Sequence, residues 1–250
     1  MTTEPTDVPP VRVVIADDQP MIRLGLTMIL DNEPDIITVG EAADGQQALD
    51  LVRTTSTDVV LLDIRMPGVD GIEATRRIRA NPSLEAVRVV VLTTFDDEEY
   101  VTQALRAGAD AFLLKDTDPA TLIAAVHRVH AGGSLIDPAV TAMVLDQWRA
   151  WGADQPGGGP GGPSHDGLAR LTPREREVLL AVARGGSNLE VAAELGITQT
   201  TVKAYVHELL TKLGCTGRSQ LVVIAYESGL VVPGTTRTPG GVGQGGPGGA

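Results

Sequence analysis

Short apolar runs alternate with amphipathic segments along the first half of the chain. Five runs of strand length, rich in Val, Ile and Leu, are separated by stretches whose apolar positions recur at helical spacing. Regular alternation of β and α units predicts an α/β domain, in which a parallel sheet is covered by helices on both faces. The strands are predicted at about 11–16, 36–40, 58–62, 87–92 and 110–114, and the helices at about 20–31, 45–53, 71–80, 97–107 and 119–131.

The pattern changes after this domain. Residues 132–150 are expected to extend the last helix as an amphipathic linker helix. Residues 152–167 are mostly glycine and proline, which cannot pack a core, and they predict a flexible tether between two domains. Residues 233–250 repeat this composition and predict a disordered tail.

The stretch between the tether and the tail is helical in pattern throughout. Thr172-Pro173-Arg174-Glu175 combines an N-cap, a proline at the first helical position and a capping-box glutamate. Glycines mark the places where the helices should end. The predicted helices run to about 183 from this cap, then from about 188 to 195, 199 to 213 and 219 to 228. The domains are therefore expected at 11–131 and 168–232, with a linker at 132–167.

Composition and charge narrow the classes of protein that fit. The chain has 250 residues, 42% of them hydrophobic, which is enough for two packed cores. The net charge of −12 is uneven, because residues 11–131 hold 11 basic and 20 acidic side chains while residues 167–232 hold 7 and 6. A single cysteine excludes an internal disulfide and a cysteine metal cluster. Without a signal peptide or a membrane-length apolar run, we expect a cytoplasmic protein with no membrane partner.

Five polar residues follow four of the predicted strands: Asp17, Asp18, Asp63, Thr93 and Lys115. Ligand sites of open α/β sheets form at the carboxyl ends of the strands, so these side chains should converge in one crevice. Three crowded carboxylates need a divalent cation, and a lysine beside them fits an incoming phosphoryl group. The spacing therefore predicts a phosphoryl-accepting site.

The same five residues, together with the segment Leu61–Gly71, resemble the receiver domain of two-component response regulators. The resemblance covers residues 11–131 and implies a flavodoxin-like sheet of five parallel strands. It implies that Asp63 accepts a phosphoryl group from the phosphohistidine of a sensor histidine kinase. Mg²⁺ would be bound by Asp18 directly and by Asp17 mainly through water.

Three further roles follow from the resemblance. Arg65 would give its backbone carbonyl to the metal, and Lys115 would pair with the phosphoryl oxygens. Thr93 would be the switch hydroxyl that draws the following loop inward. Phe112 matches the switch aromatic, although taken alone it is better explained as an ordinary core phenylalanine, and it has no hydroxyl that could hold a rotated state.

The helix predicted over 199–213 has two contrasting faces. Val202, Val206, Leu209 and Leu213 share one face and should be buried. The opposite side is small, polar and mildly basic, as suits a helix that enters a DNA major groove. Its residues are Gln199, Thr200, Lys203, Ala204, His207 and Thr211.

Residues 168–230 resemble the LuxR-type helix-turn-helix domain of NarL-like regulators, from Leu171–Leu179 to Leu210–Gly214. By resemblance, Lys203 and His207 are the best candidates for groove contacts. Thr200, Thr201 and Lys212 are candidates for phosphate contacts, and Asn188 and Gln199 are weaker ones. Glu208 departs from the family pattern; we expect it to pair with Lys212 four residues on, rather than to accept from a cytosine.

These features indicate a NarL/FixJ-type transcription regulator, with a receiver domain and a DNA-binding domain. We expect phosphorylation of Asp63 to promote dimerisation and promoter binding, with RNA polymerase as a further partner. A haloacid-dehalogenase-like phosphatase is disfavoured because Arg65 stands where that class needs a second acid, so no enzyme function is expected beyond weak self-dephosphorylation. The alternative is a regulator controlled by partner binding without phosphorylation.

Overall fold

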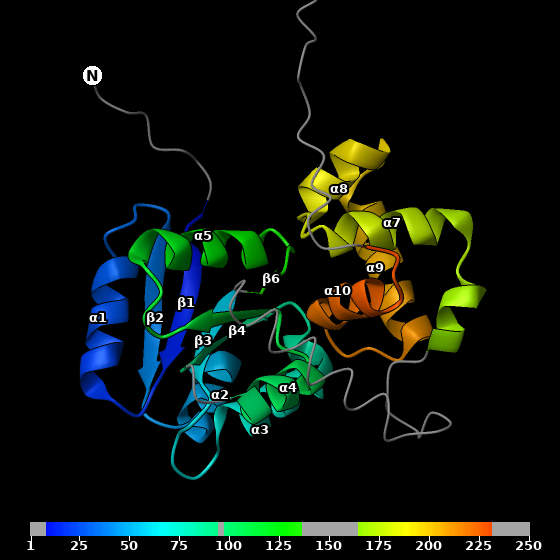
Figure 1. The fold of residues 1–250 in the computed structure, drawn as a ribbon. Helices are drawn as coiled ribbons and strands as arrows, with labels where there is room; N and C mark the ends of the chain where they lie inside the picture. Colours follow the sequence, from blue (N-terminus) through cyan, green and yellow to red (C-terminus); the bar gives the residue numbers. More distant parts are fainter. Residues whose placement is uncertain (1–8, 95–97, 137–164, 232–250) are drawn as a thin grey trace, which may run out of the picture.

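The computed structural model describes residues 9–94, 98–136 and 165–231. The first two ranges form an N-terminal α/β domain and the third forms a C-terminal helical domain (Figure 1). The N-terminal elements are β1 (Val11–Ala16), α1 (Pro20–Leu30), β2 (Ile36–Ala42), α2 (Gly45–Thr54), β3 (Val59–Asp63), α3 (Gly71–Arg79), η1 (Pro82–Leu84), β4 (Arg88–Thr93), α4 (Glu98–Ala107), β5 (Ala111–Leu114), α5 (Pro119–His130) and β6 (Leu135–Ile136).

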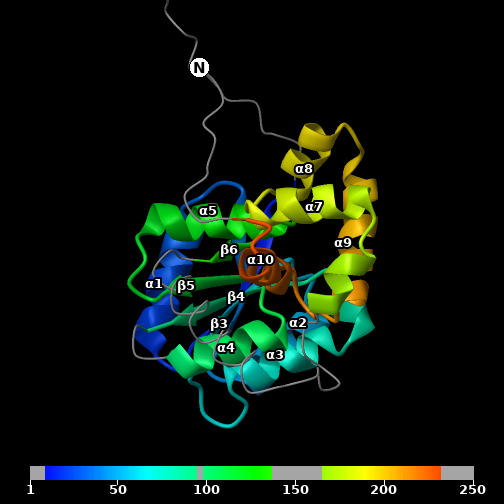
Figure 2. The ribbon, with the colours of Figure 1, turned by 45° about the vertical axis from the view of Figure 1, so that its right-hand side comes forward.

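All the strands of this sheet are parallel, in the order β2-β1-β3-β4-β5-β6. Helices α1 and α5 cover one face, and α2, α3 and α4 cover the other (Figures 1 and 2). The interior strands β3 and β5 are buried along their whole length, as expected when helices cover both faces. The predicted α/β architecture is therefore confirmed.

The predicted linker helix is wrong at its beginning. Helix α5 ends at His130, and Gly132 adopts a φ of 77°, which glycine tolerates better than other residues. The chain then forms the short strand β6, which pairs with β5 as a sixth strand. Two adjacent glycines disfavour a helix, and the positive φ of Gly132 ends this one. Residues 137–150, most of the predicted tether and the predicted tail lie outside the described residues.

The C-terminal domain consists of η2 (His165–Arg170), α7 (Pro173–Ala183), α8 (Asn188–Leu195), α9 (Gln199–Leu213) and α10 (Arg218–Glu227). Side chains cap three of these helices: Thr172 caps α7, Ser187 caps α8 and Thr198 caps α9. Gly196 and Gly214 end α8 and α9 in the left-handed conformation. Residues 165–167, assigned to the tether from their composition, form the start of η2.

The two domains contact each other directly. The first turn of α10 lies against the segment between α4 and β5, and α9 lies beside η1 (Figure 2). Among the described residues, no helix is long and apolar enough to cross a membrane.

Candidate functional site

The carboxyl ends of β1, β3, β4 and β5 are aligned at one edge of the sheet. Asp17 follows the last residue of β1, Asp63 ends β3, Thr93 ends β4, and Lys115 follows β5. Asp18 comes directly after Asp17. The register of the sheet therefore brings the five predicted residues to adjacent positions on one edge.

Lys115 lies between two buried carboxylates at the centre of this edge. Its Nζ is 2.7 Å from Asp17 Oδ2 and 2.8 Å from Asp63 Oδ2. Burial raises the pKa of Asp63, although the hydrogen bond from Lys115 acts in the opposite direction. Burial lowers the pKa of Lys115, but its hydrogen bonds to Asp17 and Asp63 outweigh that effect and the net pKa is raised. Lys115 therefore remains a cation at neutral pH.

The three carboxylates fit a divalent cation. One oxygen of each of Asp17, Asp18 and Asp63 lies within 4.8 Å of the others. Asp17 Oδ2 is buried, and its partner among the described residues is the ammonium group of Lys115. Carboxylate oxygens are the ligands that Mg²⁺ prefers. One lysine cannot neutralise three carboxylates, and a bound cation would balance the remaining charge.

A backbone contact fixes the start of the segment that follows Asp63, the last residue of β3. Gly71, the first residue of α3, donates its N–H to Ile64 O at 3.0 Å. A Cβ on Gly71 would lie 2.1 Å from Asp63 O, which is too close for any side chain. Arg65 N donates to Asp63 Oδ1 at 3.3 Å and orients the carboxylate. The role of the Arg65 carbonyl as a metal ligand stays a prediction.

Thr93 and Phe112 occupy the positions that the switch hypothesis requires. Thr93 is buried, and its Oγ1 donates to Thr94 O at 3.2 Å rather than to the carboxylates. Phe112 is fully buried in the core beneath α4. This inward placement agrees with both the switch reading and the core reading of Phe112.

The exposed face of α9 carries the residues predicted to contact DNA. Gln199, Thr200, Lys203 and His207 are exposed, whereas Thr201 is half-buried. Thr201 donates its N–H to Thr198 Oγ1 at 3.2 Å, so it belongs to the cap of α9 as well as to its surface. The expected buried face is formed by Val202, Leu209 and Leu213, with Val206 only half-buried.

Two candidate DNA contacts are engaged within the protein. Lys212 Nζ pairs with Glu175 Oε1, and this pairing lowers the pKa of Glu175. The expected pairing of Lys212 with Glu208 is therefore wrong, because a buried carboxylate of the capping box is the stronger partner. Asn188 is buried at the domain contact, where its Oδ1 accepts from Arg218 Nη1 at 2.9 Å.

A cleft of about 620 Å³ separates the exposed face of α9 from the N-terminal domain. Lys203, His207 and Thr211 line one side, and Glu85 and Arg88 line the other. His207 Nδ1 lies 3.8 Å from Glu85 Oε1 across the cleft. In this arrangement the predicted groove-reading face of α9 points at the other domain.

Comparisons with known proteins agree with this geometry. Residues 13–127 match the response regulator receiver domain, and residues 169–225 match the bacterial regulatory proteins of the luxR family. The uncharacterised transcriptional regulatory protein YxjL of Bacillus subtilis is 39% identical over 88% of this chain and 97% of its own length. The chain is a two-component response regulator with a luxR-family domain.

Other relatives of the regulator are consistent with this family. The nitrate/nitrite response regulator NarL of Escherichia coli is 35% identical over 87% of this chain and 96% of its own length. A LuxR-family two-component response regulator from Aurantimonas is 32% identical, with a TM-score of 0.51; it covers 56% of this chain and 99% of its own. The predicted domain types are therefore confirmed.

Sequence reasoning missed the residues that join the receiver to the DNA-binding domain. Thr216, Gly217, Ser219 and Gln220 contact the receiver, yet none belongs to a motif that predicts chemistry. Ser219 was expected to begin the last helix, but the helix begins one residue earlier, and its hydroxyl donates to Ala109 O of the receiver. A sequence signal that could have indicated this contact is Gly217, because it occupies an N-cap position where a polar side chain is preferred.

Proposed function

We propose that a sensor histidine kinase phosphorylates the regulator on Asp63. A carboxylate oxygen of Asp63 attacks the phosphorus of a phosphohistidine, the P–N bond breaks, and an acyl phosphate forms. Asp17, Asp18, Asp63 and the Arg65 carbonyl would hold Mg²⁺, which neutralises charge on the phosphoryl oxygens. The observation that carries this proposal is the cluster of three carboxylates around an ion-paired lysine.

The same residues would respond to the phosphoryl group once it is in place. Lys115, now paired with Asp17 and Asp63, would move its ammonium group to a phosphoryl oxygen. Thr93 would exchange its present hydrogen bond to Thr94 O for one to the phosphoryl group. Helix α4 starts five residues after Thr93, so a displacement of the intervening loop would reach it.

The DNA-binding role is proposed for the exposed face of α9. A recognition helix must lie within the major groove, which is roughly 12 Å wide. The close approach of His207 to Glu85 leaves no room for a duplex between the domains. We propose that phosphorylation separates the domains, frees α9 and allows two copies to bind two half-sites as a dimer in the cytoplasm.

Intact mass after incubation with acetyl phosphate tests the phosphoacceptor. We expect the full chain to gain one phosphoryl group, about 80 Da, only in the presence of Mg²⁺. Asp63→Asn should abolish the gain. The matched control is Asp58→Asn, because Asp58 immediately precedes β3 at its opposite end and pairs with Arg12. A gain that persists in Asp63→Asn would contradict the assignment.

Phosphorylation-dependent DNA binding needs a second measurement. The phosphorylated protein would select duplexes from a random-sequence pool, and affinity for a selected duplex would be measured by fluorescence anisotropy. We expect tighter binding after acetyl phosphate treatment of the wild type and no change in Asp63→Asn. Equal affinity before and after phosphorylation would instead favour control by partner binding.

A further inference from the structure

Helix α4 of the receiver ends against the DNA-binding domain. The last carbonyls of an α-helix have no partner within the helix. Gln220 Nε2 donates to Leu105 O at 2.8 Å and to Arg106 O at 3.3 Å. Thr216 Oγ1 donates to Arg106 O at 3.2 Å. The DNA-binding domain therefore supplies hydrogen-bond donors to the C-terminus of a helix in the other domain.

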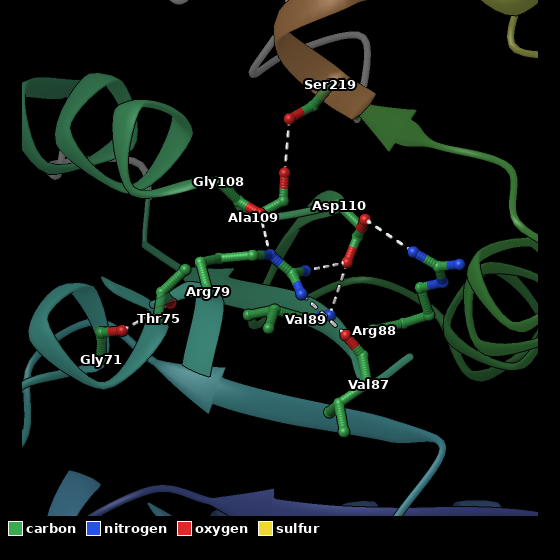
Figure 3. Close-up of polar contacts among 10 residues, drawn as sticks. All are labelled: Gly71, Thr75, Arg79, Val87, Arg88, Val89, Gly108, Ala109, Asp110 and Ser219. Carbon is green, nitrogen blue, oxygen red and sulfur yellow. Dashed lines mark hydrogen bonds and ion pairs between the residues drawn. The ribbon is translucent and has the colours of Figure 1, made fainter. Parts of the chain in front are cut away.

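Gln220 is buried, whereas Thr216 is exposed, and the two side chains are joined by a hydrogen bond. Gln220 Oε1 accepts the N–H of Thr216 at 2.8 Å, which orients the Gln220 amide so that its Nε2 points at α4. Ser219 is fully buried, and its Oγ donates to Ala109 O (Figure 3). Buried polar groups are costly to leave without partners, so these hydrogen bonds should form or break together with domain contact.

The receiver presents a rigid surface to these donors. Arg79 of α3 donates from Nε to Gly108 O at 2.8 Å and from Nη1 to Val87 O at 2.8 Å, and it pairs with Asp110 (Figure 3). The buried Asp110 also accepts the N–H of Val89 at 2.8 Å. The segment between α4 and β5 is thereby fixed to α3 and β4, so its carbonyls face α10 in one arrangement.

Gly217 allows the two backbones to meet. A Cβ on Gly217 would lie 2.8 Å from Gly108 Cα and 2.8 Å from Gly108 O, and backbone atoms cannot move aside as a flexible side chain does. The φ of Gly217 is −151° and its ψ is 155°, an extended conformation that any residue adopts. The absence of a side chain at Gly217 is therefore required by the domain contact and not by the local backbone.

The caps of the DNA-binding domain support the same conclusion. Thr172, Ser187 and Thr198 cap α7, α8 and α9 with side-chain hydrogen bonds, whereas Gly217 caps α10 with none. A serine at this N-cap would suit α10 at least as well as glycine. Serine would nevertheless place a Cβ against Gly108.

We propose that Thr216–Gln220 is a latch that holds the DNA-binding domain on the C-terminus of α4. This inference rests on the proposed function, since it names how the phosphoryl signal would reach α9. When the C-terminal turn of α4 is displaced, the hydrogen bonds from Thr216 and Gln220 to Leu105 O and Arg106 O are lost, and the contact at Gly108 alone no longer holds the domain. The latch thereby couples the position of α4 to the exposure of α9, without any contact between the DNA-binding residues and Asp63.

The test compares full-length Gly217→Ala with the wild type, each before and after acetyl phosphate treatment. Small-angle X-ray scattering gives the radius of gyration, and anisotropy gives affinity for a duplex selected by the phosphorylated wild type. Gln220→Ala provides a second variant that removes hydrogen bonds without adding bulk. The matched control is Gly25→Ala, because Gly25 lies in α1 and its added Cβ would meet nothing within 4 Å.

Before phosphorylation, we expect Gly217→Ala to have a larger radius of gyration and about tenfold tighter DNA binding than the wild type, with a smaller change in Gln220→Ala. After phosphorylation, Gly217→Ala and the wild type should converge. The latch is overturned if Gly217→Ala keeps the wild-type radius and affinity, or if it binds DNA more tightly by the same factor in both states. A wild type indifferent to acetyl phosphate would contradict the proposed function instead, and the radius of Gly217→Ala would still decide the latch.

Discussion

Two glycines, Gly71 and Gly217, allow close backbone contacts. One contact supports the phosphoacceptor site, and the other joins the DNA-binding domain to the receiver. Gly71 starts α3 and lies against the carbonyl of Asp63, so it positions the phosphoacceptor loop. Gly217 precedes α10 and lies against Gly108 of the other domain, so it positions α10 and, with it, α9. In both places the added Cβ would meet backbone atoms.

The two contacts differ in whether they lie within one domain or between the two domains. Gly71 contacts its own domain, so a larger side chain there must disturb the folded receiver. Gly217 contacts the other domain, and a larger side chain there is tolerated once the domains have separated. A close backbone contact therefore belongs to a site within one domain in the first case and to the proposed reversible arrangement of two domains in the second.

The largest effect is expected for Gly71→Ala, because its Cβ would lie 2.1 Å from Asp63 O. We expect a loss of about 3 kcal/mol in the free energy of unfolding of the receiver, together with slower phosphorylation. Gly25→Ala is the control; it should stabilise α1 by about 0.5–1 kcal/mol, because alanine is the better helix former. Urea unfolding of both variants measures these changes. Equal stability of the two variants would show that the contact at Gly71 does not constrain the receiver.

The next effect compares the caps of α7 and α10. Thr172→Ala removes a capping hydrogen bond and should cost about 1 kcal/mol in the stability of the DNA-binding domain. Gly217→Ser should cost that domain nothing, because its clash is with the receiver. Hydrogen exchange of amides in α7 and α10 measures both changes locally. Faster exchange within α10 of Gly217→Ser would show that Gly217 serves the helix itself.

A smaller effect is expected at Arg128, which makes a second contact between the domains. Arg128 Nε donates to Gly185 O at 3.0 Å, outside the latch. Because the side chain is only partly buried, Arg128→Gln should weaken the closed arrangement by about 0.5 kcal/mol. Combined with Gly217→Ala, it should have no additional effect on the radius of gyration before phosphorylation, since the domains would already be apart. An additive increase in the double variant would mean that Gly217→Ala leaves the domains docked.

The smallest effect concerns pH and the capping box of α7. The hydrogen bond from Lys212 is the largest cause of the lowered pKa of Glu175, followed by the bond from the Thr172 N–H. A carboxyl group with a lowered pKa in the folded state contributes stability that is present above its unfolded pKa and is lost as pH falls through the folded value. Glu175→Gln should therefore flatten the acid side of the stability profile of the DNA-binding domain. Thermal scans from pH 7 down to pH 3 test this, and an unchanged slope would contradict the role of Glu175.

The phosphoacceptor site was predictable from sequence because each of its residues sits at the end of its own apolar strand. The parallel register then aligns these ends, so local patterns were enough to bring Asp17, Asp63, Thr93 and Lys115 together. The faces of α9 followed in the same way from helical spacing. The prediction that Val206 is buried was only partly right, because Val206 is half-buried and lines the cleft beside the receiver.

The domain contact was not predictable because it joins segments that are distant in sequence and lack periodicity. Ser219 and Ala109 are 110 positions apart, and Gln220 and Leu105 are 115 apart. Strand β6 was missed for a related reason, because two residues are too few to show an alternating pattern. Helical spacing predicted an ion pair between Lys212 and Glu208, whereas the fold brings Lys212 to Glu175, 37 positions away.

The rate at which Cys215 reacts with iodoacetamide most directly tests whether phosphorylation of Asp63 separates the domains. Cys215 is the single cysteine of the chain, it lines the cleft beneath α9, and burial raises the pKa of its thiol to about 12. Separation would expose the thiol and lower its pKa, so we expect acetyl phosphate and Mg²⁺ to accelerate alkylation in the wild type and not in Asp63→Asn. Equal rates in the phosphorylated and unphosphorylated wild type would contradict the account.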